Sequence, residues 1–387
     1  MVQQVPPTGL SNNRPFRNKI INGDFNIFQR STSAVTAGNN TYTTADRWKT
    51  QISTDGAMTT EKESLSLADQ ATTGSASAWE IKCTSTDSSI ASNQYALFLQ
   101  SIEAQFVQDF LYGTSSAKTL TCSFWVKSSL TGTYGFFFIK GDTTAYYLPI
   151  EFTISSANTW EKKIIEISPT AGSTSLITSS GGVINNDNGI GIDIGICLAM
   201  GSDYQGTNNT WTTSAHYTTS NQVNFLSNTS NNFYITSFQL EIGNDATEFE
   251  VLPHDVQMNR CERYFESNYD YEQGYYPASD VNYTRMAGTY QMTVYVADNA
   301  RAMVPFKTHK RANATCAFYR VDGLGDGSTA GRWDFYDGGA GNWQQLDGAQ
   351  TVGEVTEYGI DINFIDTALE KQESFIVYGG WTASAEL

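Results

Sequence analysis

The sequence is short of charged and histidine side chains. Asp, Glu, Lys and Arg make up 16% of its 387 residues, against roughly 25% in an average soluble domain. It has three histidines, His216, His254 and His309, and no Gly-x-Ser-x-Gly, His-Glu-x-x-His or P-loop string. Because acyl transfer, zinc proteolysis and nucleotide hydrolysis depend on such groups, the sequence argues against all three activities.

Cysteines are also few and are not arranged for cross-linking. The five are widely spaced, odd in number and without a Cys-x-x-Cys pair, so we predict free thiols that are buried. No stretch approaches the roughly 20 apolar residues that span a bilayer, and the N-terminal segment lacks the apolar centre of a signal peptide. We therefore expect no membrane insertion, and synthesis in the cytosol.

The charges that are present are mainly acidic. The formal net charge is −17, and nucleic-acid binding draws most of its affinity from Lys and Arg. We expect no nucleic-acid partner. Aromatic residues reach 13%, and the frequent Thr, Val, Ile, Phe and Tyr favour pleated sheets.

Alternation of apolar and polar residues with a period of two predicts the strands. It is clearest at Leu120–Val126, Ile190–Ala199, Phe233–Ile242 and Tyr358–Phe364. In the third of these we expect Tyr234, Thr236, Phe238, Leu240 and Ile242 to share one face. Gly, Asn, Ser and Thr clusters separate the strands, as in antiparallel sandwiches. The predicted fold class is all-β: a jelly-roll-like antiparallel β-sandwich, a short linking helix and a second, smaller β-sandwich.

The pattern also divides the chain. We predict an extended arm at residues 1–19, a jelly-roll domain at 20–250, a helical linker at 251–268 and a C-terminal domain at 269–387. In the linker, Met258, Cys261, Tyr264 and Phe265 have helical spacing, and Asp255 is available as a cap. No heptad, collagen-like triplet or repeat of 20 to 50 residues occurs, so the sequence supports neither a coiled-coil shaft nor a solenoid.

The arm is rich in proline and basic where the rest of the chain is acidic. Arg14, Arg17 and Lys19 give it a charge opposite to that of the chain, which suits docking onto another protein. A frayed terminus is the alternative.

Several strings of residues occur in an order that resembles one known family. They are NKIINGDFNIFQRSTS, YTTADRWK, TLTCSFWVKSS, FYITSFQLEIGNDATEFE, NRCERYFE, VPFKTHKRANATCAFY and the closing GGWTASAEL. This series resembles bacteriophage tail and minor structural proteins whose first part is similar to a carbohydrate-binding-module jelly roll. His309, Lys310 and Asn313 depart from the family pattern, which more usually has Met and Pro there. From the residues themselves we expect Asp46, Arg47 and Trp48 to be structural, with an ion pair beside an indole.

The resemblance implies a virion protein, most simply a tail or fibre component that recognises a host-surface glycan. Its partners would be other virion proteins, bound through the arm, and copies of itself, most simply as a trimer. A capsid decoration, a head fibre or a purely structural tail protein is the alternative. A depolymerase is a second alternative, because the separation of two catalytic carboxylates is a tertiary property. The family offers no catalytic motif, and we predict neither an enzyme nor a cofactor.

Two aromatic segments are candidate glycan-binding sites. In the first, residues 202–222, the aromatic side chains are Tyr204, Trp211, His216 and Tyr217, with Asn208, Asn209 and Asn221 available to bind hydroxyls. These aromatics could instead pin a long loop to the sandwich or to a neighbouring subunit. In the second, Trp333, Tyr336 and Trp343 lie near Asp322, Asp326, Asp334 and Asp337, and Gly-rich hairpins are the alternative explanation. The spacing of these carboxylates matches no EF-hand loop, so we predict no metal.

Overall fold

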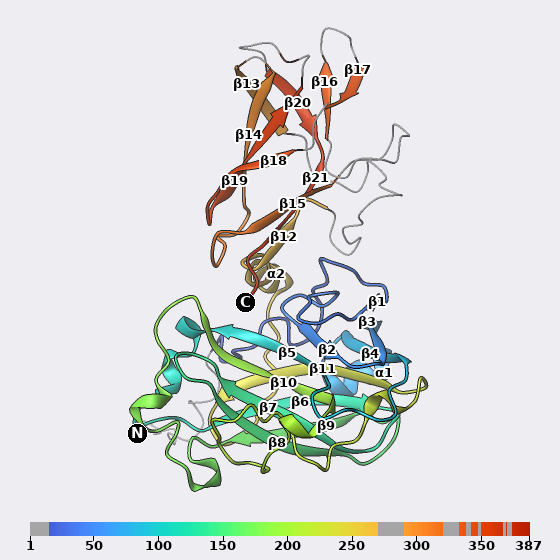
Figure 1. The fold of residues 1–387 in the computed structure, drawn as a ribbon, viewed down its shortest axis with the longest axis vertical. Helices are drawn as coiled ribbons and strands as arrows, with labels where there is room; N and C mark the ends of the chain where they lie inside the picture. Colours follow the sequence, from blue (N-terminus) through green and yellow to red (C-terminus); the bar gives the residue numbers. More distant parts are fainter. Residues whose placement is uncertain are drawn as a thin grey trace, which may run out of the picture. The chain divides into compact units, whose positions relative to one another are not determined.

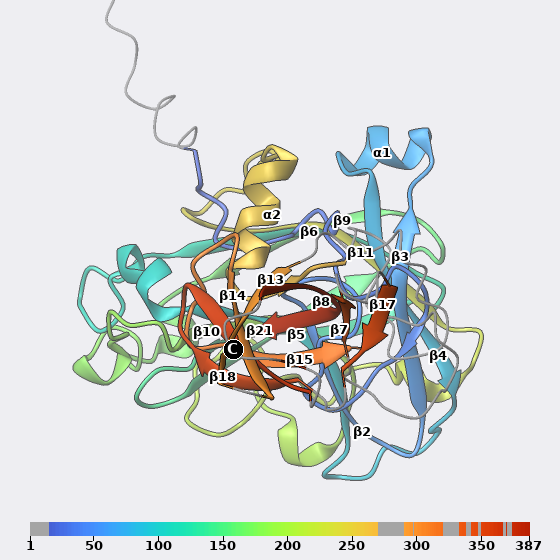
Figure 2. The ribbon, with the colours of Figure 1, turned by 90° about the horizontal axis from the view of Figure 1, so that it is seen from above.

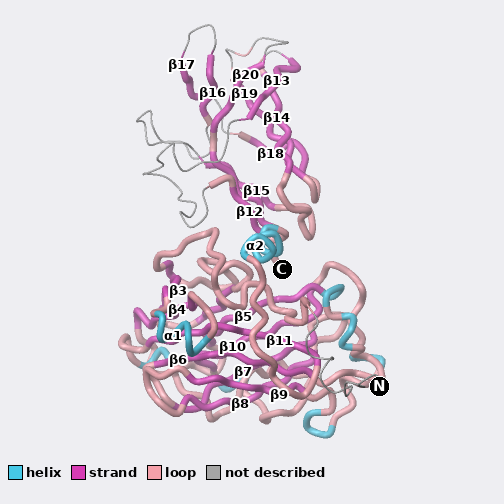
Figure 3. The backbone as a smooth tube through the Cα atoms, turned by 180° about the vertical axis from the view of Figure 1, so that it is seen from behind, coloured by secondary structure: helices cyan, strands magenta, loops and turns pink. Residues whose placement is uncertain are grey.

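A computed structural model describes residues 15–269, 290–296, 298–319, 333–337, 342–346, 350–366, 369 and 374–387. The chain forms two compact units. Unit 1 comprises residues up to Asn26, Ser33–Pro253 and Leu387, and unit 2 comprises Ile27–Thr32 and His254–Glu386. Strands dominate both units (Figure 1, Figure 3), and the predicted all-β, antiparallel sandwich architecture is confirmed.

Unit 1 is a sandwich of two antiparallel sheets (Figure 1). The six-stranded sheet has the order β1 (Val35–Thr36), β3 (Ala57–Ser64), β4 (Ser77–Ser85), β11 (Asn232–Ile242), β6 (Leu120–Ser128) and β9 (Glu161–Ile167). The five-stranded sheet has the order β2 (Lys49–Ser53), β5 (Tyr95–Glu103), β10 (Ile190–Met200), β7 (Gly132–Lys140) and β8 (Tyr146–Ile154). Helix α1 (Leu67–Thr73) extends the turn between β3 and β4 (Figure 2) and was not predicted.

Aromatic rings from both sheets and from the N-terminal loop fill the space between the layers. Phe25 packs against Trp48 and Trp79, with centroid distances of 5.0 and 5.9 Å. Phe238 stacks on Phe124 at 5.1 Å and meets Trp48 edge-on, also at 5.1 Å. All five side chains are completely buried. Such ring pairs add about 0.5–1.5 kcal/mol each beyond the burial of their area.

A bulge in β11 lets the N-terminal loop into this core. The register with β6 shifts between Thr236 and Gln239, and Ser237 has a positive φ of 52°. At the bulge the Phe238 amide donates to the Gly23 carbonyl oxygen at 2.8 Å. A Cβ on Gly23 would lie 2.1 Å from the Phe238 carbonyl oxygen, so only glycine fits there.

The bulge also changes which residues of β11 face inward. Phe233 and Ile235 are buried before it, and Phe238 and Leu240 after it, whereas Tyr234 is half-buried on the outer face. The prediction that Tyr234 shares a face with Phe238 is therefore wrong, because the extra residue inverts the alternation. In β6 the prediction is confirmed, since Leu120, Cys122, Phe124 and Val126 are all fully buried.

The longer segment of unit 2 begins with helix α2 (His254–Glu262), at the place predicted for the short helix. Asp255 lies in its first turn and not at its cap. In the described part of unit 2, one antiparallel sheet has the order β12 (Phe265–Ser267), β21 (Gly380–Ser384) and β15 (Thr315–Tyr319). The other has the order β17 (Asn342–Gln345), β16 (Asp334–Asp337), β20 (Ser374–Tyr378), β13 (Tyr290–Val296), β14 (Asn299–Pro305), β19 (Gly359–Ile365) and β18 (Thr351–Val355).

Sequence strings that carry the family resemblance contact one another within each unit. In unit 1, the Asn22 side chain donates to the Asp46 carbonyl oxygen at 3.0 Å, and the Trp48 indole donates to the Asn22 carbonyl oxygen at 3.2 Å. In unit 2, the Arg30 guanidinium lies 3.7 Å from the centroid of the Phe265 ring and 2.9 Å from a Glu386 carboxylate oxygen. Residues far apart in sequence thus form one structural set in each unit.

The expected structural role of Asp46, Arg47 and Trp48 agrees with their environment. They are at most 1% exposed, and the Arg47 guanidinium donates to the Ser101 carbonyl oxygen at 2.6 Å. All five cysteines are free, as predicted; four are buried, and Cys316 is half-buried.

A buried ion pair joins two of the strings in unit 2. The Lys310 ammonium lies 2.5 Å from a Glu266 carboxylate oxygen, and both side chains are at most 1% exposed. The ammonium also donates to the main-chain carbonyls of Glu262 and Thr308, at 2.6 and 3.2 Å. Burial lowers the pKa of Lys310, and the Glu266 carboxylate opposes that shift. The Lys310 ammonium thus donates to three acceptors.

We predict that Lys310→Met destabilises unit 2 by about 3–5 kcal/mol, because it leaves the Glu266 carboxylate buried without its cation. Chemical denaturation followed by tryptophan fluorescence measures the change. Lys307→Met is the control: its ammonium lies 3.3 Å from a Glu262 carboxylate oxygen, but its side chain is 56% exposed and solvent screens the pair. We therefore expect a change below about 1 kcal/mol. Equal effects of the two substitutions would contradict the prediction.

Candidate functional site

The outer face of the five-stranded sheet carries an apolar surface beneath a long loop. Alternation along the strands turns several apolar side chains away from the sandwich core, and they form a second cluster with the half-buried Tyr95, Ala145, Tyr147, Tyr204 and Tyr217 packed against it. Its buried members are Leu97, Leu99, Phe137, Ile139, Cys197 and Met200. Strand β10, which supplies Cys197 and Met200, is therefore covered on this outer face as well. Burial raises the pKa of the Cys197 thiol well above its usual value, so the thiol stays protonated at neutral pH.

Residues 201–222 cover one part of this face. The backbones of Tyr147 and Thr212 form two reciprocal hydrogen bonds, with N–O distances of 2.9 and 3.0 Å. The Gly206 amide donates to the Thr218 carbonyl oxygen at 2.8 Å. A Cβ on Gly135 would lie 2.2 Å from the Thr218 hydroxyl oxygen, so the strand needs glycine where the loop crosses it. The loop is therefore paired with β8 at Thr212, packs on β7 at Thr218 and is closed on itself between Gly206 and Thr218.

An open pocket of about 160 Å³ remains beside the loop. It is lined by Gln51 from β2, Tyr95 and Leu97 from β5, Met200 from β10, and Tyr204 and Tyr217 from the loop. The Tyr204 ring meets Tyr95 edge-on at 5.5 Å and Tyr217 at 6.1 Å. Three tyrosine rings thus converge on one pocket.

The polar groups of this lining are uncharged. They are the three tyrosine hydroxyls and the Gln51 amide. Burial raises the pKa of Tyr217, so its hydroxyl stays protonated and can both donate and accept. Asp193, on the same sheet face, accepts a hydrogen bond from the Ser101 hydroxyl at 2.5 Å and does not line the pocket.

Two of the four residues predicted in the first aromatic segment reach this pocket, and two do not. Tyr204 and Tyr217 line it. His216 packs against Gly206, since a Cβ there would lie 2.3 Å from the imidazole Nδ1. Trp211 is 2% exposed, meets Phe138 edge-on at 6.0 Å and donates from its indole nitrogen to the Ser168 carbonyl oxygen at 2.8 Å. The prediction of Trp211 as a sugar platform is wrong, because its ring faces are inside the domain.

The asparagines of the segment are engaged within unit 1. Asn208 accepts from the Glu151 amide at 3.0 Å, and the Asn221 amide group donates to the Glu151 carboxylate at 2.9 Å. The Asn209 backbone amide donates to the Pro149 carbonyl oxygen at 2.7 Å. They fasten the loop to β8, as the alternative explanation of this segment proposed.

In the second aromatic segment, Trp333 is not available to a ligand. Trp333 is completely buried among Tyr290, Phe318 and Phe364, at centroid distances of 5.6 to 5.9 Å, so a ligand-binding role for it is wrong. Tyr336 is 38% exposed, and its backbone pairs with that of Trp343, whose side chain lies outside the described part of the structure. Asp322 and Asp326 also lie outside the described residues.

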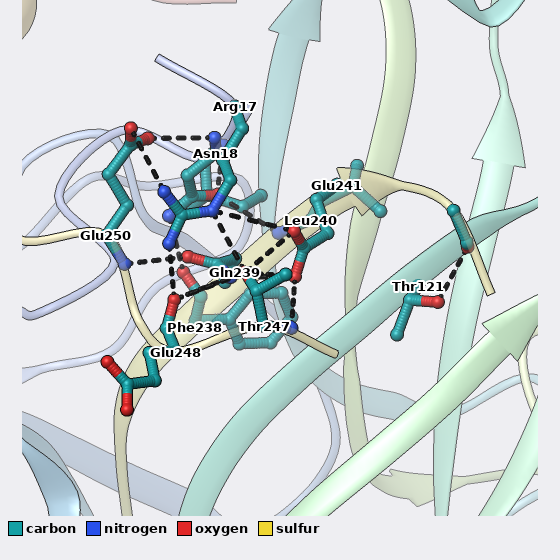
Figure 4. A network of polar contacts seen from close by, with 12 residues as sticks. Arg17, Asn18, Thr121, Phe238, Gln239, Leu240, Glu241, Thr247, Glu248 and Glu250 are labelled. Atoms are coloured by element: carbon teal, nitrogen blue, oxygen red, sulfur yellow. Dashed lines mark hydrogen bonds and ion pairs between the residues drawn. The ribbon is translucent and has the colours of Figure 1, made fainter. Parts of the chain in front are cut away.

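Of the basic residues predicted for docking, Arg14 lies outside the described residues. Lys19 forms an ion pair with Asp109 at 2.7 Å. Arg17 lies 3.6 Å from both the Glu241 and the Glu250 carboxylates and donates to the Glu248 carbonyl oxygen at 2.6 Å (Figure 4). The side chains of Glu241 and Glu250 are at most 6% exposed, so Arg17 balances two buried charges inside unit 1. A docking role for the arm stays a prediction.

Sequence reasoning missed Gln51, Tyr95, Leu97 and Met200. These residues come from three different strands, and only the sheet register brings them together: Gln51 lies opposite Leu97, and Met200 lies opposite Tyr95. One signal was available. The continuous apolar run from Tyr95 to Leu99 indicates a strand with both faces covered or contacted.

No known protein-family profile matches the sequence, and no curated protein does either. Solved structures with a similar fold include a proposed sugar-binding protein from Bacteroides thetaiotaomicron, with 13% identity, a TM-score of 0.33, and coverage of 58% of this chain and 100% of that one. Another is the enzymatically active domain of tailspike protein 4 from bacteriophage CBA120, with 10% identity, a TM-score of 0.28, and coverage of 59% and 22%.

A third is a family 11 carbohydrate-binding module from Clostridium thermocellum, in complex with a β-1,3-1,4-mixed-linked tetrasaccharide. It has 11% identity, a TM-score of 0.26, and coverage of 55% of this chain and 96% of that one. At these values the three likenesses do not indicate what this chain binds.

We predict that Trp211→Ala destabilises unit 1 by about 3–5 kcal/mol, because it empties a buried site and leaves the Ser168 carbonyl without its donor. Thermal unfolding followed by circular dichroism measures the loss. Leu67→Ala, at a side chain that is 82% exposed, is the control and should change nothing measurable. Unchanged stability of the Trp211 variant would show that the indole is not part of the core.

Proposed function

We propose that unit 1 is a carbohydrate-binding domain whose pocket holds one uncharged sugar ring. The observation that carries the proposal is the convergence of Tyr95, Tyr204 and Tyr217 on an open pocket, on a sheet face that is otherwise covered. Aromatic rings pack on the C–H faces of a sugar, while hydroxyl and amide groups bind its oxygens.

The size of the pocket supports a single ring. A cavity of about 150 Å³ holds one benzene molecule, and this pocket has a volume of about 160 Å³. A longer glycan would place one of its rings in the pocket and the remainder outside.

The composition of the lining supports a neutral sugar. An acidic sugar would lose water from its carboxylate on entry, and none of the lining residues is a cation that could replace that hydration. The lining also contains no Asp or Glu, whereas glycoside hydrolysis commonly uses two carboxylates beside the scissile bond. This supports binding without cleavage.

We propose further that the protein is a virion component that attaches a phage to glycans on its host. The support is the series of sequence strings that resembles phage tail and minor structural proteins. One shallow pocket binds weakly, with a dissociation constant on the order of 1 mM. Several copies on one particle would raise the apparent affinity by roughly 10² to 10⁴, provided that the glycans are spaced for simultaneous contact. Attachment of this kind therefore requires a multimeric arrangement.

Tyr204→Ala and Tyr95→Ala should each weaken binding of a neutral monosaccharide at least tenfold, because each removes a wall of the pocket. A glycan array identifies the sugar, and isothermal titration calorimetry measures the affinities. Tyr358→Ala, at a tyrosine of unit 2 that is 71% exposed, should bind as the wild type does. If both pocket variants bind the monosaccharide with wild-type affinity, the pocket is not the site.

The virion assignment predicts that the chain is present in purified phage particles and is accessible to antibody on the tail. Mass spectrometry and immunogold labelling test these two points. Labelling of the capsid would favour a decoration protein, and absence from the particle would refute the assignment.

A further inference from the structure

The outer face of the other sheet in unit 1 carries a row of polar and aromatic side chains across four strands. Glu61 on β3 lies opposite Glu80 on β4, Glu80 lies opposite Tyr234 on β11, and Tyr234 lies opposite Lys127 on β6. Trp160, just before β9, lies 6.4 Å from Tyr234 between ring centroids. With neighbouring strands about 4.8 Å apart, the row from Glu61 to Lys127 spans roughly 14 Å.

The charges in this row are held by specific contacts. Two carboxylates directly opposite each other repel, and the Lys82 ammonium separates them, at 2.7 Å from Glu61 and 3.1 Å from Glu80. The Lys127 ammonium lies 4.5 Å from the centroid of the Tyr234 ring and 4.9 Å from that of Trp160. Burial and the Glu80 carboxylate raise the pKa of Glu63 beside the row. This face is therefore more tightly packed than an ordinary solvated sheet surface.

Three buried polar atoms of this face have no hydrogen-bond partner in the described structure. They are the Oε1 atom of Glu80, the Oδ1 atom of Asn232 and the Nε1 atom of Trp160. The Glu80 carboxylate also interacts with the Tyr234 hydroxyl and, through Oε2, with Lys82. Asn232 lies on β11 opposite Lys82, next to the row, and the Glu80 side chain is only 3% exposed. Buried polar atoms are normally paired, so two acceptors and one donor on the same sheet face point to a bound molecule.

We propose that this row is a second carbohydrate-binding site, which takes a hydroxyl-rich segment of a glycan lying across the strands. Hydroxyl groups donate to Glu80 and Asn232 and accept from Trp160, whereas a purely cationic ligand could serve only the two acceptors. The rings of Trp160 and Tyr234 supply apolar contact beside these groups. The neighbouring Lys82 side chain is 45% exposed, so it can move aside and let a ligand reach the three atoms.

The two sites are independent of each other. The pocket lies on the five-stranded sheet and the row on the six-stranded sheet, with the sandwich core between them. A glycan bound at one site does not occupy the other. One domain can therefore hold two glycan strands, and the proposal for the row does not depend on the proposed function of the pocket.

The test uses the full chain and a panel of neutral oligosaccharides, with binding measured by titration calorimetry and saturation-transfer NMR. In a Tyr204→Ala background, weakened binding should persist, and adding Trp160→Ala should lower the remaining affinity at least tenfold. Trp160→Phe keeps a smaller aromatic ring and removes the Nε1 donor, so it should lower this affinity about three- to tenfold. Ile164→Ala, at a β9 side chain that is 58% exposed, is the matched control and should have no effect.

The outcomes separate the two sites. If Tyr204→Ala abolishes all binding, or if both Trp160 variants bind as their background does, the second site is wrong and the three atoms hold only water. If Trp160→Ala abolishes binding in the wild-type background and Tyr204→Ala has no effect, the row is the site and the pocket proposal fails. Circular dichroism of every variant separates loss of binding from loss of fold.

Discussion

Unit 1 depends on the aromatic packing between its two sheets. Phe25 comes from the N-terminal loop, Trp48 immediately precedes β2 and Phe238 comes from β11, so three distant parts of the chain share one apolar interior. The bulge at Ser237 is required by that packing, because it opens β11 to the Gly23 carbonyl and turns Phe238 inward. Once these rings are fixed, the outer face of each sheet is fixed as well.

The outer faces of the two sheets are covered in different ways. On the five-stranded sheet, alternation turns Leu97, Leu99 and Phe137 outward, and the chain covers them with the loop at 201–222, which leaves one pocket open. On the six-stranded sheet the outward residues are Glu, Lys, Tyr and Trp, and they cover one another through ion pairs and ring contacts. Both candidate sites follow from this division, because a ligand contacts what the chain itself leaves uncovered.

Much of the local structure could be predicted from the sequence. The strands at Leu120–Val126 and Ile190–Ala199 follow from alternation, and α2 follows from helical spacing and its place after Pro253. In the site, Tyr204 and Tyr217 were predictable because a run of aromatic and small polar residues favours a loop with exposed rings. Trp211 lies in the same run and is buried, since the direction of a loop side chain depends on what packs beneath it.

The sequence by itself determined the fold class, the strand periodicity and the free thiols, because these depend on residue types and local spacing. Only the tertiary structure decided which residues meet. The register brings Gln51 beside Leu97, the bulge inverts β11, and the fold aligns Glu61, Glu80, Tyr234 and Lys127 in one row. The physical reason is that pairing between strands joins positions tens of residues apart, and a shift of one residue exchanges the two faces of a strand.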